Sequence, residues 1–207
     1  MEYNEHIDRL LDLIHTIKPH QITILTGGNG RGKSLIRKQM PFVVQKLFNL
    51  DDNTMRHSVK AVSMQTRTES RSDFGAFSSI MHDWPTTPTS VATFHLIENV
   101  LKYTDNNYIV LDEIEIGMSA ESISGISEFL NKRFKEMDSQ KCYGVLIITH
   151  SDLVVKTLKH DAFLNIEGLT EEQWLSREII PTNFEALEKE STELFRAIQE
   201  RSKKIRS

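Results

Sequence analysis

Apolar positions along the chain fall into two patterns, helical spacing and short continuous runs. Helical spacing over Asn4 to Ile17 predicts an amphipathic helix, and the same spacing predicts helices over Lys33–Phe48, Val91–Tyr103, Ser119–Lys135, Asp152–Lys159 and Phe184–Ile205. Short β-rich apolar runs predict strands at Gln21–Thr26, Ser58–Met64, Tyr108–Leu111, Tyr143–Ile148 and Ala162–Ile166. Strands that alternate with helices indicate an α/β fold, with a mainly parallel sheet flanked by helices on both faces.

Two positions interrupt this alternation. Thr66–Ser90 is polar and rich in Ser, Thr and Pro, and its few apolar residues predict a small helical insertion. Pro41 is expected either to kink the helix over Lys33–Phe48 or to begin a second helical segment there. The 207 residues suit a single domain, with an N-terminal helix within 1–20, the insertion at 66–90 and a C-terminal helix over 184–205.

Composition narrows the class of protein. Apolar residues make up 39% and charged residues 26% of the chain, a balance typical of globular proteins rather than of disordered ones. Cys142 is the only cysteine, so the chain has neither an internal disulfide nor a paired-cysteine metal site. The first residues lack a signal-peptide pattern, and no apolar run approaches the roughly 18 residues of a membrane helix. We therefore expect a cytoplasmic protein without a transmembrane segment.

A glycine-rich motif directly follows the first predicted strand. It reads GGNGRGKS, which fits the pattern G-x-x-x-x-G-K-S of a phosphate-binding loop, and its residues are Gly27, Gly28, Asn29, Gly30, Arg31, Gly32, Lys33 and Ser34. Glycines let backbone N–H groups approach a triphosphate, and the helix that follows adds its positive end. Lys33 is expected at the β- and γ-phosphates, and the Ser34 hydroxyl at Mg²⁺.

Three later positions carry further candidate chemistry. The apolar run at Tyr108–Leu111 leads into Asp112, which is expected to hold Mg²⁺, and Glu113, which is expected to polarise the attacking water. His150 follows the strand over Tyr143–Ile148 and is expected near the γ-phosphate or that water. Gln65 follows the second strand, where its amide is expected to touch Mg²⁺ or the water.

These motifs, taken in order, resemble the ATP-binding-cassette ATPases. The segment LDEIEIGMS resembles the soluble branch that includes RecF, the condensin-like chromosome proteins and the OLD-type ATPases, with Ile114 in place of a proline and with Glu115 and Gly117 retained. The resemblance covers Gln21 to Asp152 and implies a P-loop NTPase fold with ATP and Mg²⁺ as ligands. It also implies a homodimer on ATP binding, and a protein partner or DNA-associated complex.

In that family each of two domains offers a signature segment to the other's ATP. The equivalent here is expected near Thr89 and Ser90, although the signature's two glycines and its glutamine are absent. An ordinary helix cap is the alternative interpretation of these two residues. For the whole chain, an ATPase that acts as a dimerisation switch is the leading hypothesis. The alternatives are an ATP-binding module with negligible hydrolysis and a P-loop phosphotransferase.

Overall fold

A computed structural model of the chain describes residues 9, 10, 12–28, 30–63, 89–102, 105–138 and 141–178, together with 189, 192, 193 and 196. The side chains at positions 56 and 89 are not described. The predictions for Asn29 and Gln65, almost all of the insertion at 66–90, and most of the C-terminal helix over 184–205 lie outside these residues.

The described elements form a five-stranded sheet in which every pairing is parallel. The strands are β1 (Ile22–Thr26), β2 (Val59–Ser63), β3 (Tyr108–Asp112), β4 (Gly144–Ile148) and β5 (Ala162–Asn165), and their order in the sheet is β2-β3-β4-β1-β5. All five positions of β3 and of β4 are buried. Strands buried on both faces read as continuous apolar runs, which is the pattern that predicted them.

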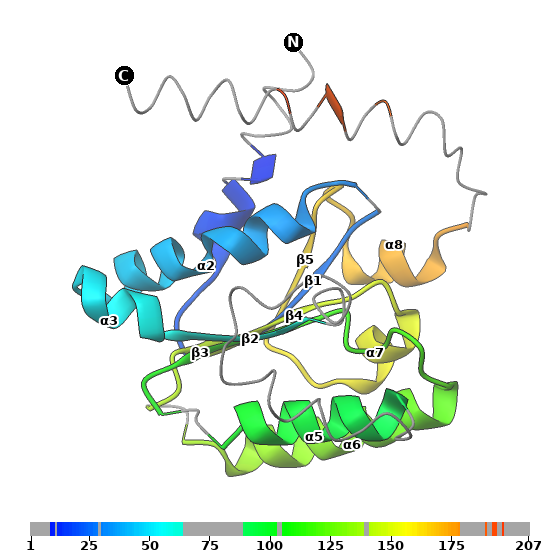
Figure 1. The fold of residues 1–207 in the computed structure, drawn as a ribbon. Coiled ribbons are helices and arrows are strands. Elements are labelled where there is room, and N and C mark those ends of the chain that lie inside the picture. The colour runs from blue at the N-terminus through cyan, green and yellow to red at the C-terminus, as the bar shows by residue number, and fades with distance from the viewer. Residues whose placement is uncertain are drawn as a thin grey trace.

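Helices cover both faces of the sheet (Figure 1). On one face lie α2 (Lys33–Phe48), followed by the short α3 (Asp52–His57), and the helical residues at 9, 10 and 12–16. On the other face lie α5 (Thr89–Val100), α6 (Ala120–Glu136), α7 (Asp152–Thr157) and α8 (Glu171–Ser176). The sheet therefore separates two hydrophobic cores. The predicted parallel sheet flanked by helices is confirmed.

The chain leaves two neighbouring strands toward opposite faces. After β1 it enters α2, whose buried Ile36 and Met40 pack on the first face, and after β4 it enters α7, whose Val154 and Val155 pack on the second. In open parallel sheets, ligands bind outside the carboxyl ends of strands at such a switch point. The topology therefore directs attention to the edge where β1 and β4 end.

Several helix boundaries differ from the expected ones. One uninterrupted α2 runs through Pro41, so the second segment expected there is not formed, and α5 begins at Thr89 rather than at Val91. Two short helices, α3 and α8, were not predicted. Each holds only six residues, and its first turn is fixed by a side-chain cap, from Asp51 in α3 and from Thr170 in α8. α3 holds one apolar residue and α8 holds two, which is too few to show helical spacing, whereas the equally short α7 holds three.

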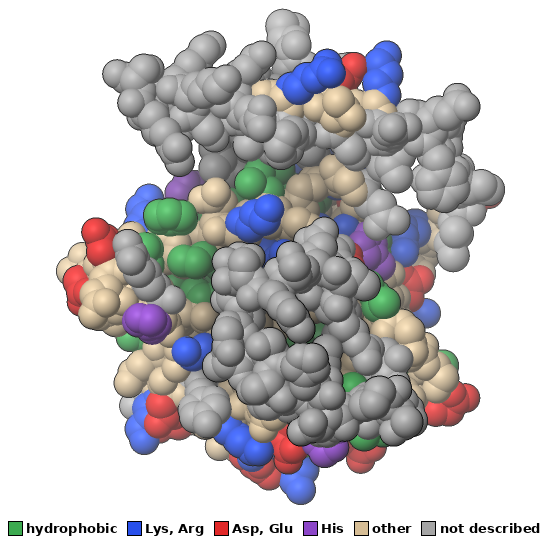
Figure 2. All heavy atoms as spheres, viewed as in Figure 1, with side chains coloured by type: hydrophobic (Ala, Val, Ile, Leu, Met, Phe, Trp, Pro, Cys, Tyr) green, Lys and Arg blue, Asp and Glu red, His purple; other side chains and the backbone are tan. Residues whose placement is uncertain are grey.

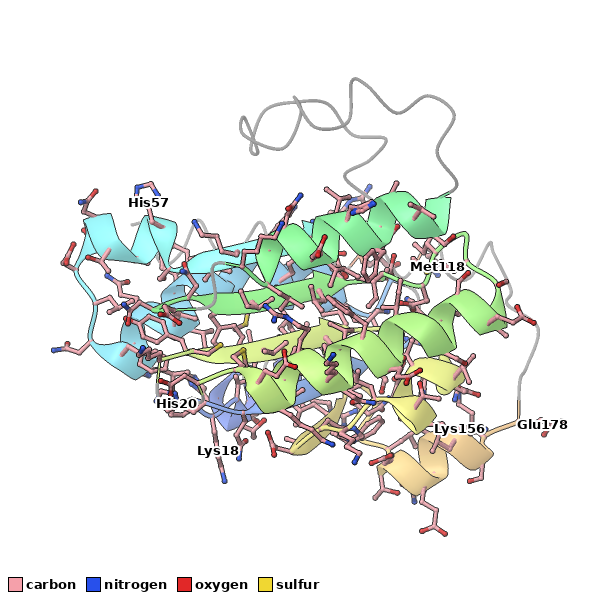
Figure 3. The ribbon with its side chains drawn as sticks, turned by 90° about the horizontal axis from the view of Figure 1, so that it is seen from below. Lys18, His20, His57, Met118, Lys156 and Glu178 are labelled. Carbon is pink, nitrogen blue, oxygen red and sulfur yellow. The ribbon has the colours of Figure 1, made fainter. Side chains whose placement is uncertain are left out.

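The two ends of the strands are distinguished in Figure 3, where Met118 lies toward the carboxyl end and His20 and His57 toward the amino end. On the face drawn in Figure 2, hydrophobic side chains gather in a small group over α2, while acidic and basic side chains mix along the lower rim. Within the described ranges, no helix combines the length and the apolar character needed to cross a bilayer.

Candidate functional site

The glycine-rich loop lies where β1 meets α2, and its backbone requires glycine. Gly27, Gly30 and Gly32 have positive φ angles of 155°, 73° and 103°. A Cβ at Gly32 would lie 2.7 Å from Leu10 Cδ1, which belongs to the N-terminal helical segment. Gly32 also precedes α2 without offering a side-chain cap. The Leu35 and Ile36 N–H groups donate to the Gly32 carbonyl, and no side chain caps the N-terminus of this 16-residue helix, so that terminus can face an anion.

Lys33 lies across this loop and is 6% exposed. Its ammonium group donates hydrogen bonds to the Gly27 and Gly28 carbonyl oxygens, at 2.9 and 2.8 Å. Burial lowers the pKa of Lys33 to about 8, although nearby carboxylates, Glu113 foremost, act in the opposite direction. At neutral pH the amine is mostly protonated, so a positive charge is held beside the backbone N–H groups of the loop.

Asp112 ends β3 with a buried carboxylate that has two close partners. Its Oδ2 accepts hydrogen bonds from Arg37 Nη1 at 2.8 Å and from Ser63 Oγ at 2.9 Å. Arg37 lies one turn into α2 after Lys33, and the sheet register pairs Ser63 with Asp112 directly. Burial raises the pKa of Asp112, while the Arg37 guanidinium and the Ser63 hydroxyl oppose that rise.

Glu113 adopts the left-handed backbone conformation, with φ of 53°, and is 7% exposed. Such a conformation costs a residue other than glycine about 1–3 kcal/mol and persists where surrounding contacts enforce it. Its N–H donates to the Ile148 carbonyl at 2.8 Å, and its Oε1 lies 3.0 Å from His150 Nε2. Because a carboxylate only accepts, the His150 ring carries its hydrogen on Nε2 in this contact.

Two further acidic side chains join the same edge of the sheet. Glu115 Oε1 accepts hydrogen bonds from the Thr149 hydroxyl at 2.7 Å and from the His150 N–H at 2.9 Å. Glu167, which follows β5, accepts a hydrogen bond from the Gly28 N–H at 2.7 Å. An internal carboxylate thus already occupies one N–H group of the loop, which demonstrates that the loop backbone binds an anionic oxygen.

The predicted site residues fall into three groups. The carboxyl ends of β1, β4 and β3 bring Lys33, His150 and the Asp112–Glu113 pair to one edge of the sheet. Ser34 is exposed in the first turn of α2, and Ser90 is half-buried in the first turn of α5. The contacts of Gln65, Asn29 and the Thr89 side chain lie outside the described residues.

Four participants were not assigned a role from the sequence: Arg37, Ser63, Glu115 and Glu167. The spacing of Arg37 from Lys33 and Ser34 puts it on their helix face, a signal available in the sequence. Glu115 was noted only as part of the resemblance. The contacts of Ser63 and Glu167 depend on which strands lie side by side, and the sequence does not reveal that order.

The donor set suits Mg²⁺ only together with phosphates. Within the described ranges, no group of three or more His, Cys, Asp or Glu side chains is arranged to hold a metal ion. Mg²⁺ is commonly bound by one or two carboxylates plus phosphate oxygens and water, rather than by a cage made entirely of protein. The buried Asp112 carboxylate, near a loop suited to phosphate, fits this mode. No protein-family model and no curated protein matches the sequence.

Proposed function

We propose that this chain is a P-loop NTPase that binds MgATP at Gly27–Ser34 and hydrolyses it, with Glu113 as the general base. One observation carries the proposal. The Lys33 ammonium group is held across a glycine loop after β1, at the same sheet edge as the half-buried His150, which follows the neighbouring β4, and the buried Glu113, which follows β3. A buried cation and a buried carboxylate paired with a histidine at one sheet edge suit phosphate chemistry.

We assign phosphate binding to the glycine-rich loop and to the N-terminus of α2. The first N–H groups of α2 and the Lys33 amine supply positive charge to the phosphates, and the glycines allow close approach. Ser34 and Asp112 would hold Mg²⁺, which when bound neutralises negative charge shared by the β- and γ-phosphate oxygens. ATP is the proposed nucleotide because the sequence has no guanine-recognition motif Asn-Lys-x-Asp.

Glu113 is the proposed base because of its position and its partner. Two strand spacings of about 4.8 Å each separate β1 from β3, a distance that a terminal phosphate and a water would span between the loop and the acidic pair. The His150 ring N–H bonded to Oε1 fixes the orientation of the Glu113 carboxylate. A fixed, ionised carboxylate can accept a proton from a water in the transition state.

Substitution of Glu113 by Gln tests this role directly. Glu113→Gln keeps the size and the acceptor oxygen but loses the base, so turnover should fall about 10²- to 10⁴-fold while ATP binding is retained. Phosphate release and calorimetric binding of ATP with Mg²⁺ would be measured on both proteins. Glu128→Gln, on an exposed position of α6, is the matched control.

Each result separates the candidate functions. Unchanged turnover in Glu113→Gln would exclude this base. Tight ATP binding by the unaltered chain without phosphate release would favour a binding module, and phosphate transfer to a small acceptor would favour a phosphotransferase.

Light-scattering mass of Glu113→Gln with and without MgATP tests the proposed homodimer, in which Thr89 and Ser90 of α5 would face the other copy's nucleotide. A mass unchanged on confirmed binding would remove that assembly.

A further inference from the structure

We infer that Glu115 is a positioning residue that holds His150 against Glu113. Through these two glutamates, the turn after β3 contacts the turn after β4 at two points. This inference rests on the proposed function, because it assigns a role in the same site. The two carboxylates lie two residues apart on one turn. One binds the His150 ring and the other binds the His150 backbone N–H.

The Glu115 contacts are short and converge on one oxygen. Oε1 accepts from the Thr149 hydroxyl at 2.7 Å and from the His150 N–H at 2.9 Å. Thr149 is fully buried, and its own N–H donates to the Leu25 carbonyl of β1 at 3.1 Å. The Thr149 hydroxyl oxygen in turn accepts from the Ser151 N–H at 2.9 Å. Glu115 therefore fixes Thr149, the residue before His150, and also the backbone of His150 itself.

The same network extends to the start of α7. Ser151 is the N-cap of that helix, and its hydroxyl accepts from the Val154 N–H at 3.3 Å. The path from Glu115 through Thr149 to Ser151 thus sets where the chain leaves β4 and where α7 begins. His150 lies between the two fixed residues, so little freedom remains in its backbone.

The turn that carries both carboxylates is itself determined by Glu113. Its left-handed φ of 53° redirects the chain at the end of β3, and the Ile116 N–H then donates to the Glu113 carbonyl at 3.2 Å. This conformation is costly for a residue with a side chain. The contacts of Glu113 and Glu115 with the β4 turn are what oppose that cost, since they anchor both ends of the redirected segment.

The Glu115 carboxylate binds the β4 turn through one oxygen. Both donors of that turn, the Thr149 hydroxyl and the His150 N–H, bind Oε1. One carboxylate oxygen therefore joins the two groups that orient His150.

Three variants and one control test the inference. Glu115→Ala removes the acceptor, and Glu115→Gln keeps one acceptor oxygen. Thr149→Val keeps Glu115 but removes the hydroxyl that donates to it and that accepts from the Ser151 N–H. Glu128→Ala, on the exposed face of α6, is the control. Three quantities would be measured on each full-length protein: kcat and KM for ATP with Mg²⁺, and the exchange rate of the His150 backbone amide by NMR.

Glu115→Ala should lower kcat about 10- to 100-fold, because a general base must be held in place for efficient proton transfer. KM should change by no more than about twofold, since the loop that binds phosphate is untouched. The His150 amide should exchange about five- to tenfold faster, through loss of one hydrogen bond, while the amides within β4 stay protected. Glu115→Gln should recover most of the activity, and Thr149→Val should show a smaller defect.

An unchanged kcat in a folded Glu115→Ala protein would overturn the inference, and so would a lower kcat with unaltered exchange at His150. If Glu115→Ala does not fold, Glu115→Gln and Thr149→Val decide the question. Full activity in both of these variants, together with unaltered His150 amide exchange in Thr149→Val, would then overturn the inference. If the unaltered protein releases no phosphate, the proposed hydrolysis fails, but the amide exchange still tests the Glu115 contact.

Discussion

The carboxyl and amino ends of the strands differ in whether their charged side chains are buried. Among the described residues, the buried charged side chains are Lys33, Asp112 and Glu113, and all three lie at the carboxyl end. At the amino end, Phe48 stacks on Tyr143 with ring centroids 4.0 Å apart.

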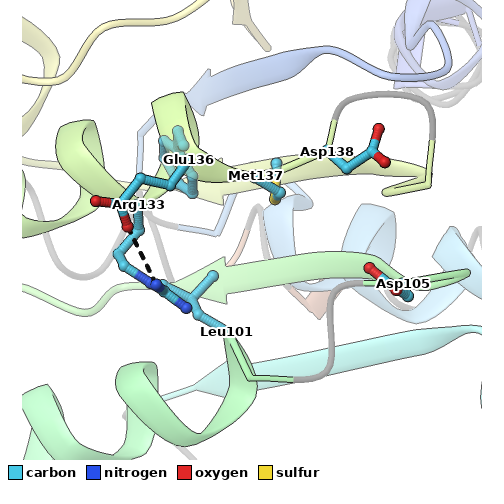
Figure 4. A pocket seen from close by; sticks show the side chains of 7 residues that line it. Leu101, Asp105, Arg133, Glu136, Met137 and Asp138 are labelled. Atoms are coloured by element: carbon cyan, nitrogen blue, oxygen red, sulfur yellow. Dashed lines mark hydrogen bonds and ion pairs between the residues drawn. The ribbon is translucent and has the colours of Figure 1, made fainter.

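A small pocket at that amino end is lined by Leu101, Asp105, Arg133, Phe134, Glu136, Met137 and Asp138 (Figure 4). Its ion pair, between Arg133 and Glu136, has both partners at least 40% exposed. Burying charge costs several kcal/mol per ion, and within the described part of the chain that cost falls at the carboxyl end. This asymmetry is the expected signature of a functional edge, and four substitutions test it.

The largest expected effect comes from the Arg37–Asp112 pair. Arg37→Met leaves the Asp112 carboxylate buried without its cation and should lower the free energy of unfolding by about 3–5 kcal/mol at neutral pH. The folded-state pKa of Asp112 would then lie further above its unfolded value, so the deficit should shrink as pH falls and the carboxyl protonates. Urea unfolding across this pH range measures both effects.

The matched control at the amino end is Arg133→Met, which breaks an exposed pair and should cost at most about 1 kcal/mol. Equal losses at the two ends would contradict the contrast drawn between them.

The next effect concerns Lys33, whose folded-state pKa of about 8 lies below the ordinary lysine value of 10.5. Protonated Lys33 therefore opposes folding, and Lys33→Met should raise the free energy of unfolding by up to about 3 kcal/mol at neutral pH. Between pH 8 and 10.5 the unfolded chain binds the extra proton, so the unaltered protein gains stability with pH. The advantage of the variant should accordingly decline by about 1.4 kcal/mol per pH unit.

Thermal or urea unfolding over that range, together with ATP binding, checks this prediction. The variant should also lose ATP binding. Lys141→Met, at an exposed position near the amino end, is the matched control. A stability advantage that stays constant with pH would show that desolvation of the amine is not its origin.

A steric effect at the amino end should leave the proposed function intact. Gly144 has φ of 141°, and a Cβ there would lie 2.6 Å from Tyr108 Cε2. Gly144→Ala should therefore lower the free energy of unfolding by about 1–3 kcal/mol, with ATP affinity unchanged. Gly125→Ala, where a Cβ meets nothing within 4 Å in α6, should instead stabilise by about 0.5–1 kcal/mol. Loss of ATP affinity in folded Gly144→Ala would show that the two ends are coupled.

The smallest expected effect concerns Glu167, which lies beside the loop at the carboxyl end. Glu167→Gln removes a negative charge beside the loop while keeping an oxygen for the Gly28 N–H. ATP should then bind about two- to fivefold more tightly, the range expected of a partly exposed charge. Calorimetric titration of the variant against Glu172→Gln, an exposed change on α8, measures the difference. Weaker binding would instead assign Glu167 to holding the loop in shape.

Local sequence was sufficient to predict most elements of the sheet and the ends of its strands. The apolar runs that became β3 and β4 are buried along their whole length, and the residues that follow them are those expected to carry chemistry. Short segments stabilised by a cap rather than by an apolar stripe, such as α3 and α8, were missed. The dimer, the nucleotide and the reaction stay predictions.

The sequence by itself determined the glycine loop before a helix, and the acidic pair and the histidine at strand ends, because these features depend on neighbouring residues and on periodicity. Only the tertiary structure decided the strand order β2-β3-β4-β1-β5 and, with it, which side chains meet. Arg37 and Asp112 are 75 residues apart, as Gly28 and Glu167 are 139 apart. Contacts between residues so distant in the chain arise only once the two faces of the sheet have buried their apolar surface and brought the strand ends to one edge.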